Sequence, residues 1–176
     1  MSYLRPKGVL VGPGCHDVIS TQGLVGPAYE RRESGNMLVA LVVERVIQED
    51  PTGCGLACVS MVVSASYAEV RKLAIEHLGF DSVGPFYTDL DDLRYMLDWY
   101  GYGLLRWTPF KSYKPISPVS IMGIERNGSG VEDHWVVHVK CGLDRYVFDP
   151  SRTVKTVQRR DWWKLRPVSY ANIIKL

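Results

Sequence analysis

The chain has 176 residues, of which 46% are hydrophobic and 23% are charged, and its formal net charge is +2. This length fits about one domain with a hydrophobic core of its own. So small a net charge argues against nucleic acid or an anionic membrane as a partner. No apolar run approaches the length of a membrane span, and the N-terminus lacks the apolar segment of a secretory signal peptide. The basic pairs Arg31-Arg32 and Arg159-Arg160 are assigned to the solvated surface.

The first part of the chain, residues 1–36, is rich in glycine and proline. This composition favours loops over regular structure. We therefore expect an irregular N-terminal arm that contains short strands at Val9–Val11 and Val18–Ile19. Residues 37–176 are expected to form a single domain on which this arm packs.

The four cysteines, Cys15, Cys54, Cys58 and Cys141, lack the close local spacing of a zinc site. We expect neither a metal nor a cofactor. Cys54 and Cys58 would lie one turn apart on the same face of a helix, where a disulfide between them is disfavoured. Free cysteines are typical of a reducing compartment, so the expected location is the cytoplasm.

The apolar segment Met37–Ile47 predicts a strand. A turn-rich segment with Pro51 and Gly53 follows, and then a run, Leu56–Val63, that is able to form a helix. Cys54 is therefore predicted at or just before a helix N-terminus. The unpaired N–H groups and the helix dipole at that place favour the thiolate, which is the nucleophilic form of cysteine.

Cys54 has two interpretations. A buried free cysteine often packs like a small hydrophobic residue. The flanking glycines, Gly53 and Gly55, instead leave room for a substrate backbone beside the thiol, and a polar residue, Gln48, lies upstream of the turn. These neighbours favour the interpretation of Cys54 as a reactive thiol.

Two further helices are expected after the first. The segment Ser66–Glu69 has the pattern of a capping box and begins a helix that Gly79 ends. A similar N-cap signal at Thr88–Asp91 begins a third helix, which Gly101 closes. Apolar residues recur on one face of both helices.

The pattern then changes to short segments typical of strands: Leu104–Trp107, Val119–Met122, Trp135–Val139 and Arg145–Phe148. Gly142 suits the first central position of a type II′ turn between the last two. Helices come first in the chain and strands come second. This segregation predicts an α+β fold with an antiparallel sheet.

Two histidines and one aspartate of the predicted hairpin are candidates for proton transfer with Cys54. If Gly142 lies at the turn, His134 and His138 are both diagonal to Asp149 on one face, about 7–8 Å away at the backbone. A carboxylate bonded to one ring nitrogen fixes the tautomer, and the other nitrogen is then able to take the thiol proton. The alternative is a structural histidine and an Asx-type turn at the aspartate.

The position along the strand separates the two histidines. His134 begins the strand, directly after the glycine-rich loop 127–133, whereas His138 lies between Val137 and Val139, where core packing is expected. A catalytic base has to reach both the thiol and a substrate that arrives from solvent. This requirement favours His134.

Four segments occur in the order and with the spacing of a known pattern: Gln48, Cys54–Cys58, His134–Val137 and Tyr146–Pro150. They resemble the papain-like cysteine peptidases that cleave bacteriocin leader peptides after a double glycine. The resemblance spans residues 38–165. The family usually has an acidic or amide residue before its nucleophile, where this chain has Gly53.

The resemblance implies a papain-like fold in which N-terminal helices pack on a C-terminal antiparallel sheet. It implies Cys54 as the nucleophile and His134 as the base. Asp149 then orients the base, and Gln48 contributes to the oxyanion hole. The expected substrate is a peptide or protein, cleaved after small residues such as glycine. Because the chain has no transmembrane spans or ATPase motifs, it resembles the free-standing relatives rather than the peptidase part of an export transporter.

Two alternatives remain open at this point. An acyl transferase or a deamidase would use the same triad, because the acyl-enzyme half of the reaction is common to all three activities. A module that binds peptides without cleaving them would share only the scaffold. The complete set of Cys54, His134, Asp149 and Gln48 argues against the second alternative.

Overall fold

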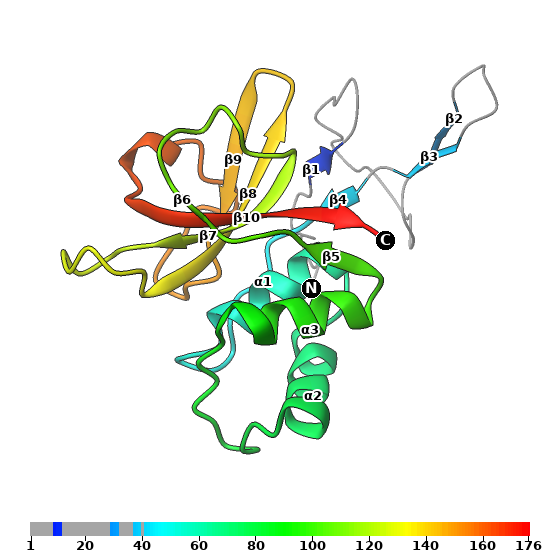
Figure 1. Ribbon diagram of the computed structural model, residues 1–176, viewed down its shortest axis with the longest axis vertical. Helices are drawn as coiled ribbons and strands as arrows, with labels where there is room; N and C mark the ends of the chain where they lie inside the picture. Colours follow the sequence, from blue (N-terminus) through cyan, green and yellow to red (C-terminus); the bar gives the residue numbers. More distant parts are fainter. Residues whose placement is uncertain (1–8, 12–28, 32–36, 40) are drawn as a thin grey trace, which may run out of the picture.

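The computed structural model describes residues 9–11, 29–31, 37–39 and 41–176. Three helices come first: α1 (Cys54–Val63), α2 (Tyr67–Leu78) and α3 (Leu90–Trp99). The strands of one sheet follow: β5 (Tyr102–Leu104), β6 (Thr108–Pro109), β7 (Val119–Ile124), β8 (His134–Cys141), β9 (Asp144–Phe148) and β10 (Pro167–Lys175). A 3-10 helix, η1 (Trp162–Lys164), precedes β10. This order confirms the predicted α+β class (Figure 1).

Two short strand pairs lie N-terminal to α1: β1 (Val9–Val11) with β4 (Leu41–Val43), and β2 (Tyr29–Arg31) with β3 (Met37–Val39). The strand predicted at Val9–Val11 is confirmed. The segment Val18–Ile19 and most of the predicted arm lie outside the described residues. The prediction of one strand over Met37–Ile47 is wrong, because β4 ends at Val43 and residues 44–48 are irregular.

The start of α1 is free of a side-chain cap. The helix begins at Cys54 as predicted, and its N-cap residue, Gly53, makes no side-chain hydrogen bond. A Cβ atom at Gly53 would lie 1.8 Å from the Tyr67 hydroxyl oxygen, so no larger residue fits there without a shift. The first N–H groups of α1 therefore face the site without competition from a capping side chain.

The other two helices begin with capping boxes. Ser66 and Glu69 form the predicted box at the start of α2, and Gly79 ends that helix in a left-handed conformation. At α3 the predicted N-cap signal is shifted by one residue: Asp89, not Thr88, accepts hydrogen bonds from the first-turn N–H groups. A carboxylate accepts two such bonds at once and complements the helix dipole.

No helix in the described part of the chain is long and apolar enough to cross a membrane.

The sheet is antiparallel throughout, in the order β5-β10-β7-β8-β9, and β6 pairs with β10 at one edge. The predicted register of the β8–β9 hairpin is confirmed by the pairing of His138 with Val147. Gly142 lies at the turn with φ +59, a conformation that favours glycine.

The longest strand, β10, was not predicted from the sequence. β10 crosses the sheet between β5 and β7 (Figure 1). Its sequence places Pro167, Ser169 and Asn172 among apolar residues, so neither a continuous apolar run nor a clean alternation marks it. β5 likewise ends earlier than predicted, at Leu104.

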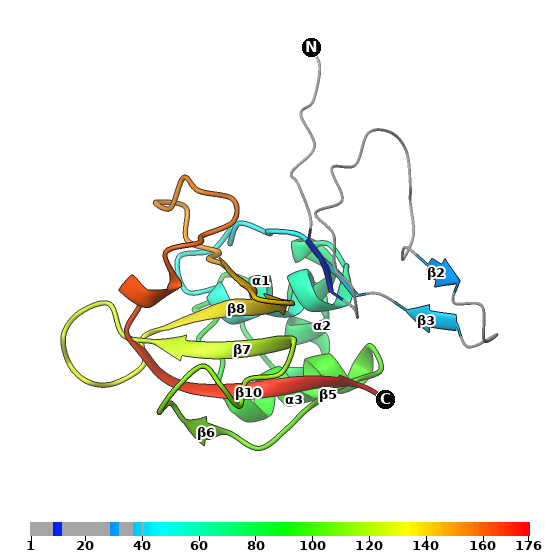
Figure 2. The same ribbon diagram turned by 90° about the horizontal axis from the view of Figure 1, so that it is seen from above.

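Two hydrophobic clusters cover the two faces of the sheet. The larger one joins the helices to the sheet and includes Val137 and Val139 of β8. The smaller one lies on the opposite face and includes Val136 and Val147. Successive residues of a strand point to opposite faces, so β8 contributes to both clusters. Figure 2 shows the helices gathered on one side of the sheet.

A buried arginine joins the irregular segment after β4 to the loop after β9. Arg45 is 9% exposed, and its guanidinium donates to the carbonyl oxygens of Asp149 at 2.6 Å, Ser151 at 2.7 Å and Val154 at 2.8 Å. The Gln48 N–H also donates to the Pro150 carbonyl at 3.0 Å. These bonds explain why residues 44–48 leave the strand conformation. Their polar groups hydrogen-bond the loop after β9 instead of a neighbouring strand.

We expect Arg45→Met to lower the free energy of unfolding by about 2–4 kcal/mol, because three carbonyls lose a charged donor while the aliphatic packing is kept. Urea unfolding followed by circular dichroism measures this change. Arg106→Met is the control. Its arginine is exposed, and its substitution should change stability by less than about 0.5 kcal/mol. Equal effects of the two substitutions would mean that the bonds of Arg45 contribute little to stability.

Candidate active site

The Cys54 thiol lies at the start of α1 and contacts the beginning of β8. The His134 ring hydrogen-bonds the sulfur, and the backbone N–H groups of Trp135 and Gly55 donate to it. Burial alone raises the pKa of this thiol, but these donors and the positive charge of His134 outweigh burial and lower the pKa below its usual value. The structure therefore favours the thiolate at Cys54, as its place at a helix N-terminus predicted.

His134 and Asp149 form a buried pair. Nε2 of His134 lies 2.8 Å from Oδ1 of Asp149, and the two residues are only 4% and 2% exposed. Burial lowers the pKa of His134, but the bonds to the Asp149 carboxylate and the Cys54 thiol raise it above its usual value. Because Nε2 is bonded to the carboxylate, Nδ1 is left to exchange a proton with the thiol.

The carboxylate of Asp149 has two further donors. The Ser151 N–H donates to Oδ1 at 2.9 Å, and Nη1 of Arg159 donates to Oδ2 at 3.3 Å. Burial raises the pKa of Asp149, but His134, the Ser151 N–H and Arg159 together lower it below its usual value. The carboxylate therefore stays charged and keeps one orientation toward His134.

The sequence assignment of Arg159 to the solvated surface is wrong. Its side chain is 19% exposed and is bonded to both Asp149 and Asp161. The segment around Arg159 also pairs with β9 through reciprocal backbone hydrogen bonds to Val147, each 2.9 Å long. No local signal in the sequence indicates this contact, because a pair of arginines in a polar loop is typical of the surface.

Gln48 lies in the loop before Cys54 and is 7% exposed. Its Nε2 donates to the carbonyls of Asp50 at 2.9 Å and Pro51 at 2.8 Å, and its buried Oε1 has no partner among the described residues. Both amide hydrogens are thus used within the loop. A role in an oxyanion hole requires one of these bonds to be exchanged for the substrate oxygen, and that role stays a prediction.

The structure separates His138 from the thiol, as its mid-strand position predicted. His138 is fully buried among Ser120, Tyr113 and Arg145, with Nδ1 3.4 Å from the Ser120 hydroxyl and Nη1 of Arg145 3.3 Å from Nε2. Burial and the nearby positive charges lower the pKa of His138 to about 3. The His138 ring is therefore neutral at ordinary pH, and it packs on the face of the sheet opposite the helices.

Among the described cysteines, Cys58 is a poor candidate for chemistry. Cys54, Cys58 and Cys141 are free thiols. Cys58 is completely buried, and burial together with the negative charge of Cys54 raises the pKa of its thiol well above the usual value. Within the described ranges, no group of three or more His, Cys, Asp and Glu side chains is placed to hold a metal ion.

Comparison with known proteins places this arrangement in a known fold. No family model and no curated protein matches the sequence. Solved structures do match, among them the following two. One is a double glycine motif protease from an AMS/PCAT transporter in complex with the leader peptide, with 15% identity, a TM-score of 0.54, and coverage of 76% of this chain and 92% of that chain. The other is the peptidase domain of Streptococcus ComA, a bi-functional ABC transporter involved in a quorum sensing pathway, with 17% identity, a TM-score of 0.54, and coverage of 75% and 96%.

The chain has the fold of a papain-like double-glycine peptidase domain. Such low identity carries no residue roles, so the roles in this site depend on its own geometry. In this papain-like fold, α1 presents Cys54 to the first residue of β8, and the loop after β9 presents Asp149 to the same histidine. A thiol, an imidazole and a buried carboxylate meet in that order.

The pKa directions predict the pH dependence of alkylation. The thiolate exists above the lowered pKa of Cys54, and the imidazolium exists below the raised pKa of His134, so both shifts favour the thiolate–imidazolium pair over the neutral pair. Iodoacetamide should therefore modify Cys54 at a pH below the ordinary range of thiol ionisation. His134→Ala should reduce that rate at least about tenfold near pH 6.5, because a shift of one pKa unit is a factor of ten in thiolate.

His138→Ala is the matched control for this measurement. It removes an imidazole from the same strand but not from the thiol, so the low-pH alkylation should persist even if the protein is less stable. Peptide mapping identifies Cys54 as the modified residue. Low-pH reactivity that survives in His134→Ala and disappears in His138→Ala would overturn the assignment of the base.

Proposed function

We propose that the chain is a cysteine peptidase that cleaves peptide bonds with Cys54 as nucleophile, His134 as base and Asp149 as orienting acid. The observation that supports this most directly is the chain of contacts from the Cys54 thiol through His134 to the buried Asp149 carboxylate. The pKa of Cys54 is lowered and that of His134 is raised, which is the combination that prepares a thiolate and a proton donor at one place. The papain-like fold agrees with this chemistry.

The reaction follows from these groups in two steps. The Cys54 sulfur attacks the peptide carbonyl carbon and forms a C–S bond, and the C–N bond breaks as the His134 imidazolium gives its proton to the leaving amine. Neutral His134 then takes a proton from water, whose oxygen attacks the thioester carbon. The C–S bond breaks, and the products are a peptide acid, a peptide amine and the regenerated thiol pair.

The negative charge on the carbonyl oxygen needs donors during both steps. The Cys54 N–H is a suitable donor, because it lies in the first turn of α1, where backbone N–H groups have no intrahelical partner and no side-chain cap is present. Gln48 is the second proposed donor. It lies nearby in the same loop and would exchange one of its two loop hydrogen bonds for the oxyanion.

The proposed substrate is a peptide or protein segment with small residues, such as glycine, before the scissile bond. One structural match is a double glycine motif protease that was solved with a leader peptide. The expectation that Gly53 and Gly55 leave room for a substrate backbone is wrong. A Cβ atom would lie 1.8 Å from the Tyr67 hydroxyl oxygen at Gly53 and 1.9 Å from the Thr88 hydroxyl oxygen at Gly55, so both glycines make room for side chains of the protein itself.

The test of the nucleophile compares two cysteines. We expect Cys54→Ala to abolish cleavage of a proteome-derived peptide library and to leave the fold intact. Cys58→Ala should keep cleavage and lower the free energy of unfolding by about 1–2 kcal/mol, as for a small truncation in a core. Mass spectrometry identifies the new N-termini, and urea unfolding measures stability. Cleavage that depends on Cys58 and not on Cys54 would overturn the assignment of Cys54 as the nucleophile.

The same library distinguishes peptidase activity from the alternatives. A peptidase creates new N-termini, a deamidase changes only side-chain amides, and an acyl transferase needs an added amine. A peptide-binding module without activity would give none of these products.

Gln48→Ala should lower kcat on a cleavable peptide far more than it raises KM, because an oxyanion donor acts in the transition state. Losing one such donor commonly costs about 2.7–4 kcal/mol of barrier. Steady-state kinetics and urea unfolding are measured on the same variant, since Gln48 also bonds its own loop. A change in KM alone would assign Gln48 to substrate binding, and a loss of stability with kcat intact would assign it to the loop.

A further inference from the structure

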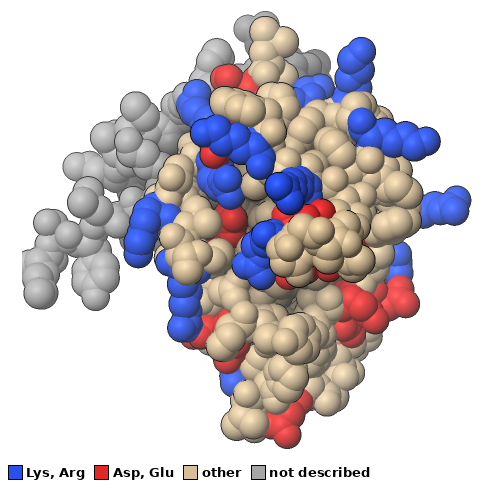
Figure 3. Space-filling view, turned by 90° about the vertical axis from the view of Figure 1, so that its left-hand side faces the viewer, with Lys and Arg blue, Asp and Glu red and all other residues tan. Residues whose placement is uncertain are grey.

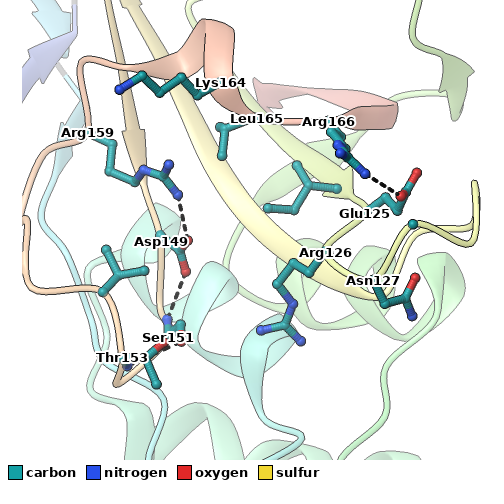
Figure 4. A pocket seen from close by; sticks show the side chains of 13 residues that line it. Glu125, Arg126, Asn127, Asp149, Ser151, Thr153, Arg159, Lys164, Leu165 and Arg166 are labelled. Atoms are coloured by element: carbon teal, nitrogen blue, oxygen red, sulfur yellow. Dashed lines mark hydrogen bonds and ion pairs between the residues drawn. The ribbon is translucent and has the colours of Figure 1, made fainter.

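A cavity of about 520 Å³ is lined in part by Asp149. It lies between the end of β7, the loop after β9 and the segment after η1 (Figure 4). Its charged lining consists of four basic side chains, Arg126, Arg159, Lys164 and Arg166, and two carboxylates, Glu125 and Asp149. We call it the Arg126 pocket. The lining has an excess of positive charge although the whole chain is nearly neutral.

The carboxylates of this pocket are already bonded. Glu125 accepts from Arg166 at 3.3 Å, and Asp149 accepts from His134 and Arg159. Arg159 is further bonded to Asp161. Arg126 is paired with Asp133, which lies outside the lining, so Arg126 and Lys164 are the two cations without a carboxylate partner inside the lining.

Arg126 is placed to meet a ligand. Its Nε and Nη2 donate to the side chain and carbonyl of Asp133, each at 3.3 Å, and Nη1 takes part in neither bond. Figure 4 shows its side chain projecting from the end of β7 into the space opposite Ser151 and Thr153, with Lys164 on the rim beside Arg159. Figure 3, which views this side of the molecule, shows Lys and Arg side chains gathered on this face.

The proposed reaction indicates which part of the substrate would lie toward this pocket. His134 has to give its proton to the amine of the departing peptide, so that peptide lies on the His134 side of Cys54. Asp149 is the partner of His134 and also lines the pocket. A departing chain that continues past His134 and Asp149 would lead toward the Arg126 pocket, because Asp149 also lines it.

We propose that the Arg126 pocket binds a carboxylate of the departing peptide and so selects substrates with an acidic group soon after the scissile bond. This inference rests on the proposed peptidase function. The carboxylate belongs either to an Asp or Glu side chain or to the C-terminus of a short departing segment. Guanidinium and ammonium groups bind both sources by the same charge-assisted hydrogen bonds.

The experiment uses the full chain and pairs of peptides built on a sequence that it cleaves in the library. In one arm, Asp or Glu in the first residues after the scissile bond is compared with Asn or Gln, with the C-terminus amidated. In the other arm, a free C-terminal carboxylate is compared with the amide. The acidic member of a pair should be cleaved with a kcat/KM about tenfold higher at low salt, as expected for a hydrogen bond to a charged group. High salt should reduce this ratio, because the pocket is open to solvent.

The variant that tests the pocket is Arg126→Gln with Lys164→Gln, which should reduce the ratio to less than about twofold. Arg94→Gln is the control, since this exposed arginine of α3 is paired with Asp91 and its loss changes the net charge in the same direction. It should keep the ratio. If the double variant unfolds, Lys164→Gln alone should still lower the ratio by about threefold, because Lys164 is exposed.

The outcomes separate this inference from the proposed function. Cleavage that depends on Cys54 but shows no preference for a carboxylate, or a preference that survives the substitutions, overturns the inference and leaves the peptidase proposal standing. The arm that shows the preference identifies the source of the carboxylate. Absence of any Cys54-dependent cleavage overturns both proposals.

Discussion

The buried carboxylate of Asp149 is the constraint around which the site is arranged. A charged group with 2% exposure is costly unless several donors replace its water. Here the donors come from three parts of the chain: His134 at the start of β8, the N–H of Ser151 in the following loop, and Arg159 in a segment that pairs with β9. Meeting the solvation need of one carboxylate therefore fixes the orientation of the histidine that faces the thiol.

Residues that precede α1 hold the backbone of the loop that carries Asp149. Arg45 binds the carbonyls of Asp149, Ser151 and Val154, and Gln48 N–H binds that of Pro150. The arginine side chain is nearly as buried as the carboxylate and has exchanged water for three carbonyl oxygens. Positive charge thus surrounds the loop on its backbone side through Arg45 and on its side-chain side through Arg159, while neither arginine touches the thiol. The segment that leads to Cys54 and the segment that carries Asp149 are one unit in space.

The parts of this protein that the sequence predicted are those with local causes. The start of α1 follows from Pro51 and Gly53, the α2 cap follows from Ser66 and Glu69, and the β8–β9 register follows from Gly142. The choice between His134 and His138 could also be made locally, from their places along one strand. Thr88 was mistaken for the α3 cap because it and Asp89 are adjacent good caps, and only the contacts of the Thr88 carbonyl and side chain distinguish them.

The parts that the sequence did not predict have distant causes. Arg45 and Arg159 resemble ordinary polar-loop residues until the fold brings the Asp149 loop to them. β10 carries polar residues whose partners lie far away in the sequence, such as Asn172, which accepts from the N–H of Ser117 in the segment before β7 at 3.0 Å. The orientation of the Gln48 amide is likewise decided by carbonyls of its own loop rather than by residue type.

The place of β10 has a consequence for the time at which the site can form during synthesis. This strand is the last described element of the chain, yet it joins β5 to β7 in the middle of the sheet. A nascent chain that has left the ribosome only as far as β9 already contains Cys54, His134 and Asp149, but its sheet lacks a central member and α1 has no complete surface to pack on. Contacts of such large sequence separation form late and cooperatively. The complete sheet on which α1 packs therefore forms only after translation has passed β10.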